Sequence, residues 1–147
     1  MKIAIVGAEE GRWYAKNVNT VKNTIERVLM KHAIEEDEIT FISGGCPYGG
    51  IDIWAEKIAD KLIESDLIQE KKIYLPQVKS WEDVRGKLGY KSRNLQIAYN
   101  CDILYVFSPF YDGKLIWNGG EWTANQAGYM GKDVNRVWIN EKGDTVG

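Results

Sequence analysis

The sequence has few of the side chains that most often build metal sites and nucleophilic catalytic centres. Among 147 residues there are two cysteines, Cys46 and Cys101, and one histidine, His32. A zinc site made from cysteine and histidine needs three or four such ligands close together, and these three are widely separated. We therefore expect neither a metal nor a resident cofactor, and little scope for Ser-His-Asp or Cys-His catalysis. We expect His32 at the surface or at a helix end.

Long hydrophobic runs and an excess of one charge are also missing. No apolar run reaches the roughly 18 to 20 residues of a membrane helix, and the apolar stretch in residues 1–7 is too short for a signal peptide. The net charge of −2, without a basic cluster, argues against nucleic acid as a partner. A hydrophobic content of 44% suits the core of one domain spanning residues 1–147. These features predict a cytoplasmic globular protein that does not engage a membrane.

Apolar strands alternate with amphipathic helices along the chain. Strands are predicted at residues 3–6, 39–42, 72–75, 102–107 and 135–139. Helices are predicted at residues 17–33, at 51–63, at 92–100, and from the second glycine pair to about residue 131. Residues 77–90 show no clear period, and residues 108–118 are predicted to form a loop. The alternation predicts an α/β fold, a three-layer α/β/α sandwich with a mostly parallel sheet of about five strands.

Two glycine-rich turns are the most informative features. One spans residues 43–52 and the other residues 118–123, and each leads into a predicted helix. A turn without side chains, followed by a helix N-terminus, presents unpaired N–H groups and a positive dipole end to an anion. The carboxyl ends of parallel strands meet at one edge of the sheet, which predicts a pocket there for a phosphate-bearing ligand. The candidates at this edge are Gly7, Ala8, Ser43, Gly44, Gly45, Ser108, Gly119 and Gly120.

Each of these signals also has an ordinary structural interpretation. A glycine taken singly is more often just a turn residue, and neither turn matches G-x-G-x-x-G or the Walker A pattern. Arg93 and Asn94 could bind phosphate or simply begin a helix, and Asp52 could cap its helix or accept ribose hydroxyls. Six aromatic residues near this edge could stack on a base, pack in the core or line an oligomer interface. They are Trp13, Tyr14, Tyr48, Tyr111, Trp117 and Trp122, whereas Trp54 lies on an apolar helix face and is predicted to be core.

Taken in order, these pieces resemble the SLOG superfamily, a Rossmann-like group that includes DNA-processing protein A, YspA-like proteins and LOG phosphoribohydrolases. The resemblance spans nearly the whole chain and is closest to the YspA-like proteins. The matching segments are Gly7-Ala8, Ser43-Gly44-Gly45, Gly50-Ile51-Asp52, Arg93-Asn94, Asp102 to Phe107 and Gly119-Gly120-Glu121-Trp122-Thr123.

The resemblance implies a Rossmann-like fold and a site for a nucleotide or a nucleotide-derived ligand. It implies that Arg93 and Asn94 line the pocket and that Asp52 lies near the ribose. The residues that it implies for the phosphate are Gly44, Gly45, Gly119, Gly120 and Thr123.

One departure from the family pattern bears on catalysis. The glutamate that assists N-glycosidic cleavage in LOG enzymes is replaced by Gln126, and Trp122 takes the place of a third glycine. Glutamine cannot accept a proton or place a full negative charge near an oxocarbenium-like transition state. The remaining carboxylate candidates are Glu9 and Glu121.

The sequence therefore favours a nucleotide-ligand binding protein or sensor. An N-glycosidic enzyme, either a nucleoside monophosphate phosphoribohydrolase or a nucleoside deoxyribosyltransferase-like protein, is the alternative. A DNA-associated role like that of DNA-processing protein A is a third hypothesis, which the acidic charge balance disfavours. The many aromatic residues are compatible with a homo-oligomer.

Overall fold

Five parallel strands form the centre of the molecule. The computed structural model describes residues 1–146. The parallel strands are β1 (Lys2–Gly7), β2 (Thr40–Ser43), β3 (Glu70–Ile73), β4 (Ile103–Tyr111) and β6 (Asp133–Ile139). Two short antiparallel strands, β5 (Lys114–Leu115) and β7 (Thr145–Val146), pair with β4 and β6. The strand order is β3-β2-β1-β4-β6-β7, with β5 beside β4.

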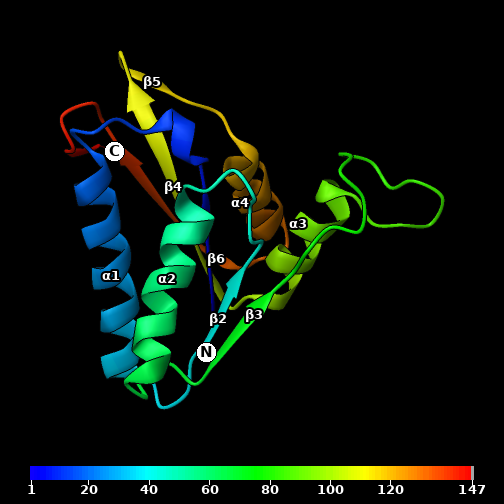
Figure 1. Cartoon of the computed structure of the whole chain (residues 1–147), viewed down its shortest axis with the longest axis horizontal. Helices are drawn as coiled ribbons and strands as arrows, with labels where there is room; N and C mark the ends of the chain where they lie inside the picture. The colour runs from blue at the N-terminus through cyan, green and yellow to red at the C-terminus, as the bar shows by residue number, and fades with distance from the viewer. Residues whose placement is uncertain (147) are drawn as a thin grey trace.

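Helices cover both faces of this sheet. Helices α1 (Val18–Glu35) and α2 (Ile51–Glu64) lie on one face, and α3 (Tyr90–Asn100) and α4 (Gly119–Tyr129) lie on the other (Figure 1). The predicted α/β/α sandwich is thereby confirmed. No helix within residues 1–146 combines the length and the apolar character needed to cross a membrane.

Each helical layer has its own hydrophobic core. Ile3 and Ile5 of β1 pack toward α1 and α2, whereas Ala4 and Val6 pack toward α3 and α4. All four are buried because successive strand residues point to opposite faces, and both faces are covered. Trp54, a residue of α2, lies in the core as predicted, with 8% of its surface exposed.

The chain reverses its direction across the sheet between β1 and β4. From β1 it proceeds outward through β2 to β3, and it then returns to place β4 on the other side of β1. The helix that follows β1 packs on one face, and the helix that follows β4 packs on the opposite face (Figure 1). In open parallel sheets such a switch point leaves a crevice beyond the carboxyl ends of the two strands.

Three strand predictions need correction. The predicted loop at residues 108–118 contains the end of β4 and all of β5, joined by a tight turn at Asp112 and Gly113, both with positive φ. The third strand lies two residues earlier than predicted, at 70–73. It is the edge strand, and Glu70, Lys71 and Lys72 are exposed, so hydrophobicity does not mark its position. The short strand at 145–146 was not predicted, since two residues carry no pattern.

His32 lies in the last turn of α1, which confirms the predicted helix end, but it is buried and not at the surface. Only 7% of its surface is accessible, and its Nε2 lies 2.7 Å from the Tyr105 hydroxyl. The residue continues the buried stripe of α1 that includes Ile25 and Leu29 at helical spacing. Burial lowers the pKa of His32 and favours the neutral ring, although nearby Glu35 acts in the opposite direction.

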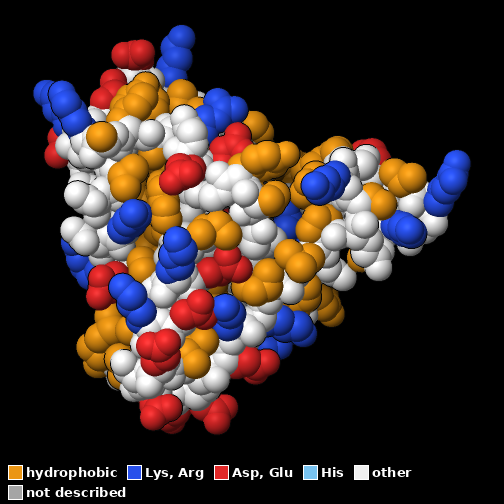
Figure 2. Space-filling view, viewed as in Figure 1, with side chains coloured by type: hydrophobic (Ala, Val, Ile, Leu, Met, Phe, Trp, Pro, Cys, Tyr) orange, Lys and Arg blue, Asp and Glu red, His pale blue; other side chains and the backbone are white. Residues whose placement is uncertain are grey.

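The segment after β3 projects away from the sheet as an arm (residues 77–89; Figures 1 and 2). It has no helix or strand, as predicted, but it is bonded internally, because the Leu88 carbonyl accepts from the amides of Gln77 and Val78. Its Trp81 ring packs edge-on against Trp122 in the first turn of α4, with 4.8 Å between centroids. The arm therefore braces the helix beginnings on this face.

Candidate functional site

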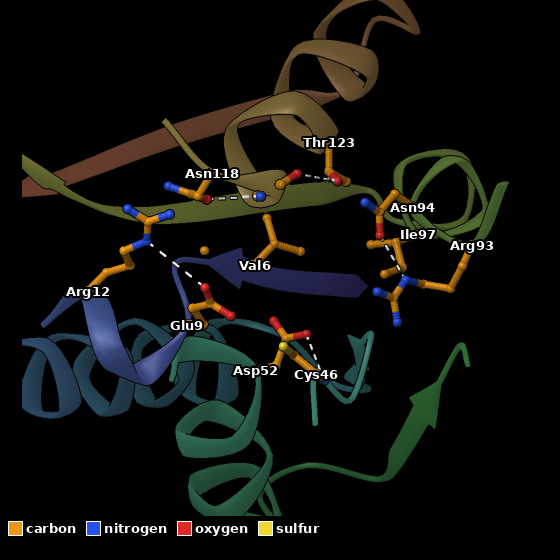
Figure 3. A pocket seen from close by; sticks show the side chains of 13 residues that line it. Val6, Glu9, Arg12, Cys46, Asp52, Arg93, Asn94, Ile97, Asn118 and Thr123 are labelled. Carbon is orange, nitrogen blue, oxygen red and sulfur yellow. Dashed lines mark hydrogen bonds and ion pairs between the residues drawn. The ribbon is translucent and has the colours of Figure 1, made fainter. Parts of the chain in front are cut away.

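A cavity of about 240 Å³ opens beyond the carboxyl ends of β1 and β4, where the switch point predicts a crevice (Figure 3). Arg12 and Glu9 lie at one end, Arg93 and Asn94 lie at the other, and Asp52 lies between them. The lining residues are Val6, Gly7, Glu9, Arg12, Cys46, Asp52, Arg93, Asn94, Ile97, Asn118, Gly119, Gly120 and Thr123.

The cavity brings together many, though not all, of the residues that the sequence singles out. The predicted residues that line it are Gly7, Glu9, Asp52, Arg93, Asn94, Gly119, Gly120 and Thr123. The predicted residues outside the lining are Ala8, Ser43, Gly44, Gly45, Ser108 and Glu121. The lining residues that sequence reasoning missed are Val6, Arg12, Cys46, Ile97 and Asn118.

The loop after β1 holds Glu9 and Arg12 at the cavity. The Trp13 indole donates to the Ala8 carbonyl at 3.2 Å, and the Tyr111 hydroxyl donates to the Arg12 carbonyl at 2.8 Å. These bonds fix the short 3₁₀ helix η1 (Glu10–Arg12) while leaving the Arg12 side chain half exposed. Its Nε lies 4.0 Å from a Glu9 carboxylate oxygen, a weak ion pair in this exposed setting. The Arg12 guanidinium is therefore accessible to an anion.

At the opposite end of the cavity, Arg93 connects two loops through hydrogen bonds. Its Nη1 donates to the carbonyls of Gly44 and Tyr74, and its Nε donates to Asn94 Oδ1 at 2.7 Å. The turn at Gly44 and Gly45 thus supports Arg93 and does not itself form the wall. Ser43 is fully buried and its hydroxyl accepts from the Gly45 amide at 3.3 Å. Arg93 combines a structural role with a position in the cavity lining.

Helix α2 begins at Ile51, as predicted, directly after Gly50. Gly50 is the N-cap residue with φ of 74°, and a Cβ there would lie 2.4 Å from the Ala8 carbonyl oxygen. Asp52 therefore does not cap its helix, which corrects one of its two predicted roles. One of its oxygens, Oδ2, instead accepts from the Cys46 amide at 3.1 Å. That bond fixes the carboxyl group at the cavity.

Asp52 is a buried carboxyl group without an ion pair. Only 8% of its surface is accessible, and no lysine or arginine nitrogen within the described chain lies within 4.0 Å of its oxygens. Burial raises the pKa of Asp52 to about 6, although the Cys46 amide and the Arg93 charge oppose this. A carboxyl group that exchanges its proton near neutral pH is a common feature of functional clefts.

The beginning of α4 forms another wall. The Asn118 side chain is the N-cap, and its Oδ1 accepts from the amides of Gly120 and Glu121 at 2.9 and 3.3 Å. Gly120 lies so close to β1 that a Cβ would come within 2.6 Å of Gly7 Cα. At Gly119, by contrast, the nearest atom to such a Cβ is Asn94 Nδ2 at 4.0 Å, so Gly119 presents bare backbone to the cavity.

Glu121 does not line the cavity, which removes the geometric support for it as a catalytic candidate. It is 1% exposed, and its Oε2 accepts from the Ser108 hydroxyl at 2.7 Å and the Trp138 indole at 3.2 Å. Its other oxygen lies 3.7 Å from Arg136 Nε. Gln126 is not among the lining residues either. Glu9 and Asp52 are the two carboxyl groups of the cavity.

The cavity lining contains a thiol but no aromatic ring. Burial raises the pKa of Cys46, and Asp52 and Glu9 act in the same direction, so the group stays a weakly nucleophilic thiol at neutral pH. None of the six aromatic residues predicted near this edge is in the lining. Trp13 and Tyr111 are buried, whereas Tyr48 and Trp117 are exposed. Within residues 1–146 no three histidine, cysteine or acidic side chains are placed to hold a metal ion.

No protein-family model matches the chain, and no curated protein matches it. Among solved structures the chain is similar to the molybdenum cofactor carrier protein MCP from Chlamydomonas reinhardtii. The TM-score is 0.57 at 15% sequence identity, and the match covers 94% of this chain and 75% of that chain. At this identity the likeness shows the fold alone, and the two chains share a Rossmann-like α/β architecture.

Proposed function

We propose that this chain binds a nucleotide or a nucleotide-derived, phosphate-bearing small molecule in the cavity, as a binding protein or sensor. The observation that carries the proposal is the meeting of Arg12, Arg93 and the N-terminus of α4 around one small cavity at the switch point. Guanidinium groups and a helix N-terminus both favour an anion, and the carboxyl groups of Asp52 and Glu9 can hydrogen-bond with polar groups of a ligand. Phosphate and sugar are the chemical groups that this combination fits.

Two likenesses support the proposal. The order of the sequence motifs resembles the SLOG superfamily, whose members take nucleotide-derived ligands. The structurally similar MCP is a molybdenum cofactor carrier protein, so a protein of this fold carries a small molecule. The carrier role of MCP favours binding over turnover, as does Gln126 in place of the family's glutamate.

Arg12 offers the sharpest test of the site, because within residues 1–146 its side chain makes no hydrogen bond and only a weak, exposed ion pair with Glu9. Thermal unfolding is measured against AMP, ADP-ribose, NAD, cyclic nucleotides and free nucleosides. A ligand at about 100 times its Kd adds roughly 2.7 kcal/mol of stability, which is several degrees in Tm. Arg12→Ala should weaken the affinity for a phosphate-bearing ligand about tenfold, as expected for one lost charge-assisted contact.

Arg27→Ala is the matched control, since Arg27 is an exposed arginine on α1 that does not line the cavity. Its affinity should stay within about twofold of wild type. Equal losses in the two variants would indicate a general charge effect and not a site. If none of these ligands raises the Tm of the wild-type protein, that result would count against the proposal.

An N-glycosidic enzyme remains the second candidate, favoured by two carboxyl groups in different environments. Glu9 is half exposed, whereas burial raises the pKa of Asp52, and such a pair can divide acid and base roles. Release of free base from AMP is the test. Loss of release in Glu9→Gln, with release intact in Glu121→Gln, would support the enzyme, and no release by the wild-type protein would exclude AMP as a substrate.

A further inference from the structure

Asp52 occupies a place in the cavity where its charge conflicts with an anionic ligand. It is nine-tenths buried, it forms no ion pair within residues 1–146, and its Oδ2 accepts a hydrogen bond from the Cys46 amide. The Arg93 guanidinium is directed to the Gly44 and Tyr74 carbonyls and does not bond the carboxylate. A carboxylate in this setting has little to compensate for its lost hydration.

The charged and titratable groups around Asp52 come from every neighbouring element. Glu9 and Arg12 face the cavity from the loop after β1 and from η1, and Cys46 faces it from the loop after β2. Arg93 faces it from α3. Glu56 lies one turn further along α2, where burial and then Asp52 raise its pKa.

Asp52 lies between the Arg12 end and the Arg93 end of the cavity, so a phosphate bound between these two arginines is near its carboxyl group (Figure 3). A phosphate charge within roughly 8 Å of the carboxyl group is close enough to act on it. At that separation one negative charge changes the proton affinity of a carboxylate by about tenfold or more at the effective dielectric constant of a partly buried site. The ligand anion therefore favours the neutral form of Asp52.

We propose that Asp52 takes up a proton when the cavity binds a phosphate-bearing ligand, which makes binding stronger on the acid side of neutral pH; this inference rests on the proposed function. The proton goes to Oδ1, since Oδ2 accepts from the Cys46 amide. The resulting O–H group can donate to a ligand oxygen. No other group around the cavity fits this role as well. The Glu9 carboxylate is half exposed, and Cys46 is a thiol that holds its proton.

The experiment is titration calorimetry with ADP-ribose at about pH 7, in two buffers that differ in ionisation enthalpy. ADP-ribose is the probe because its pyrophosphate exchanges no proton between about pH 6 and 8. The wild-type protein should take up about half a proton per ligand, and its affinity should fall several-fold from pH 6 to pH 8. Asp52→Asn should take up no proton and show a flat pH profile. Asp37→Asn, an exposed acid outside the cavity, is the control and should behave as wild type.

The outcomes separate this inference from the proposed function. Binding of ADP-ribose without proton uptake, or uptake that persists in Asp52→Asn, overturns the role of Asp52 and leaves the binding function standing. Absence of ADP-ribose binding in both proteins, alongside binding of another panel member, overturns the inference for this ligand class. Absence of any binding overturns both. Uptake in wild type that disappears only in Asp52→Asn supports both.

Discussion

Replacing Asp52 by asparagine is expected to stabilise the protein by about 2 to 3 kcal/mol at pH 7 to 8. Burial raises the pKa of Asp52 to about 6 from an ordinary value of 3.8, so ionising this group costs more in the folded chain than in the unfolded one. An asparagine side chain is nearly the same size and can still accept from the Cys46 amide through its carbonyl oxygen. The variant removes the cost of the buried charge and keeps the hydrogen bond.

The pH dependence gives the sign of this effect. A folded-state pKa above the unfolded value means that the folded protein holds the proton more tightly. Below about pH 4 both states are protonated and the carboxyl group costs nothing. The cost then grows with rising pH until about pH 6 and is constant above it. The stability advantage of Asp52→Asn should therefore be absent near pH 4, appear between pH 4 and 6, and reach a plateau above pH 6.

Denaturant unfolding at several pH values measures this advantage directly. At about 2 to 4 °C per kcal/mol for a chain of this length, Tm should rise by roughly 5 to 10 °C at pH 7. His32 changes stability in the opposite direction as the pH falls, because burial lowers its pKa, but it is present in both proteins and cancels in their difference. Asp37→Asn should leave stability within about 0.5 kcal/mol. A variant no more stable than wild type at pH 8 would mean that Arg93 fully compensates the charge.

A carboxyl group that lowers stability at neutral pH needs a reason to be there. Function is the usual one, because sites that bind or react often hold groups in states that destabilise the fold. Within residues 1–146 Gly50 is the N-cap of α2, and the one hydrogen bond of the Asp52 carboxyl group is to the Cys46 amide, so the helix itself does not require an acid here. Greater stability of Asp52→Asn, together with a ligand affinity that no longer depends on pH, would join the two arguments.

The sheet and much of the cavity could be predicted because they follow from local pattern. The apolar runs of β1 and β4 are buried on both faces, so each gives a continuous signal. The rule for parallel sheets then places the turns after β1, β2 and β4 at one edge, and Gly7, Asp52 and Gly119 line one cavity there. The topology alone predicts the positions of these residues, because Gly7 ends β1 and because Asp52 and Gly119 lie in the first turns of α2 and α4.

The remaining lining residues depend on contacts between distant segments. Arg12 reaches the cavity because Tyr111, about 100 residues later in the chain, bonds its carbonyl, and no local pattern encodes that bond. Asn118 does carry a local signal, since an asparagine directly before a helix is a strong N-cap. The direction of Glu121 was not predictable, because the groups that bond it, Ser108 and Trp138, lie on two other strands.

Replacement by alanine should affect stability very differently at the two adjacent glycines at the beginning of α4. Gly120→Ala should destabilise the protein by about 3 kcal/mol, since its Cβ would lie 2.6 Å from both Gly7 Cα and Gly7 N, and a backbone cannot move aside cheaply. Gly119→Ala should change stability by less than about 1 kcal/mol, because the added methyl group meets nothing closer than 4.0 Å and alanine favours helix. Denaturant unfolding of both variants tests this difference.

Gly119→Ala should weaken ligand binding even though it has little effect on stability. In Gly119→Ala the fold is intact but the methyl group enters the cavity, so a phosphate that approaches the α4 backbone should bind about tenfold more weakly. An intact fold with unchanged affinity would place the ligand away from α4. The sequence predicts that both glycines contribute to one phosphate site, but in the structure the two residues have different roles. Gly120 is needed because β1 and α4 touch there, and Gly119 is the residue whose bare backbone is open to a ligand.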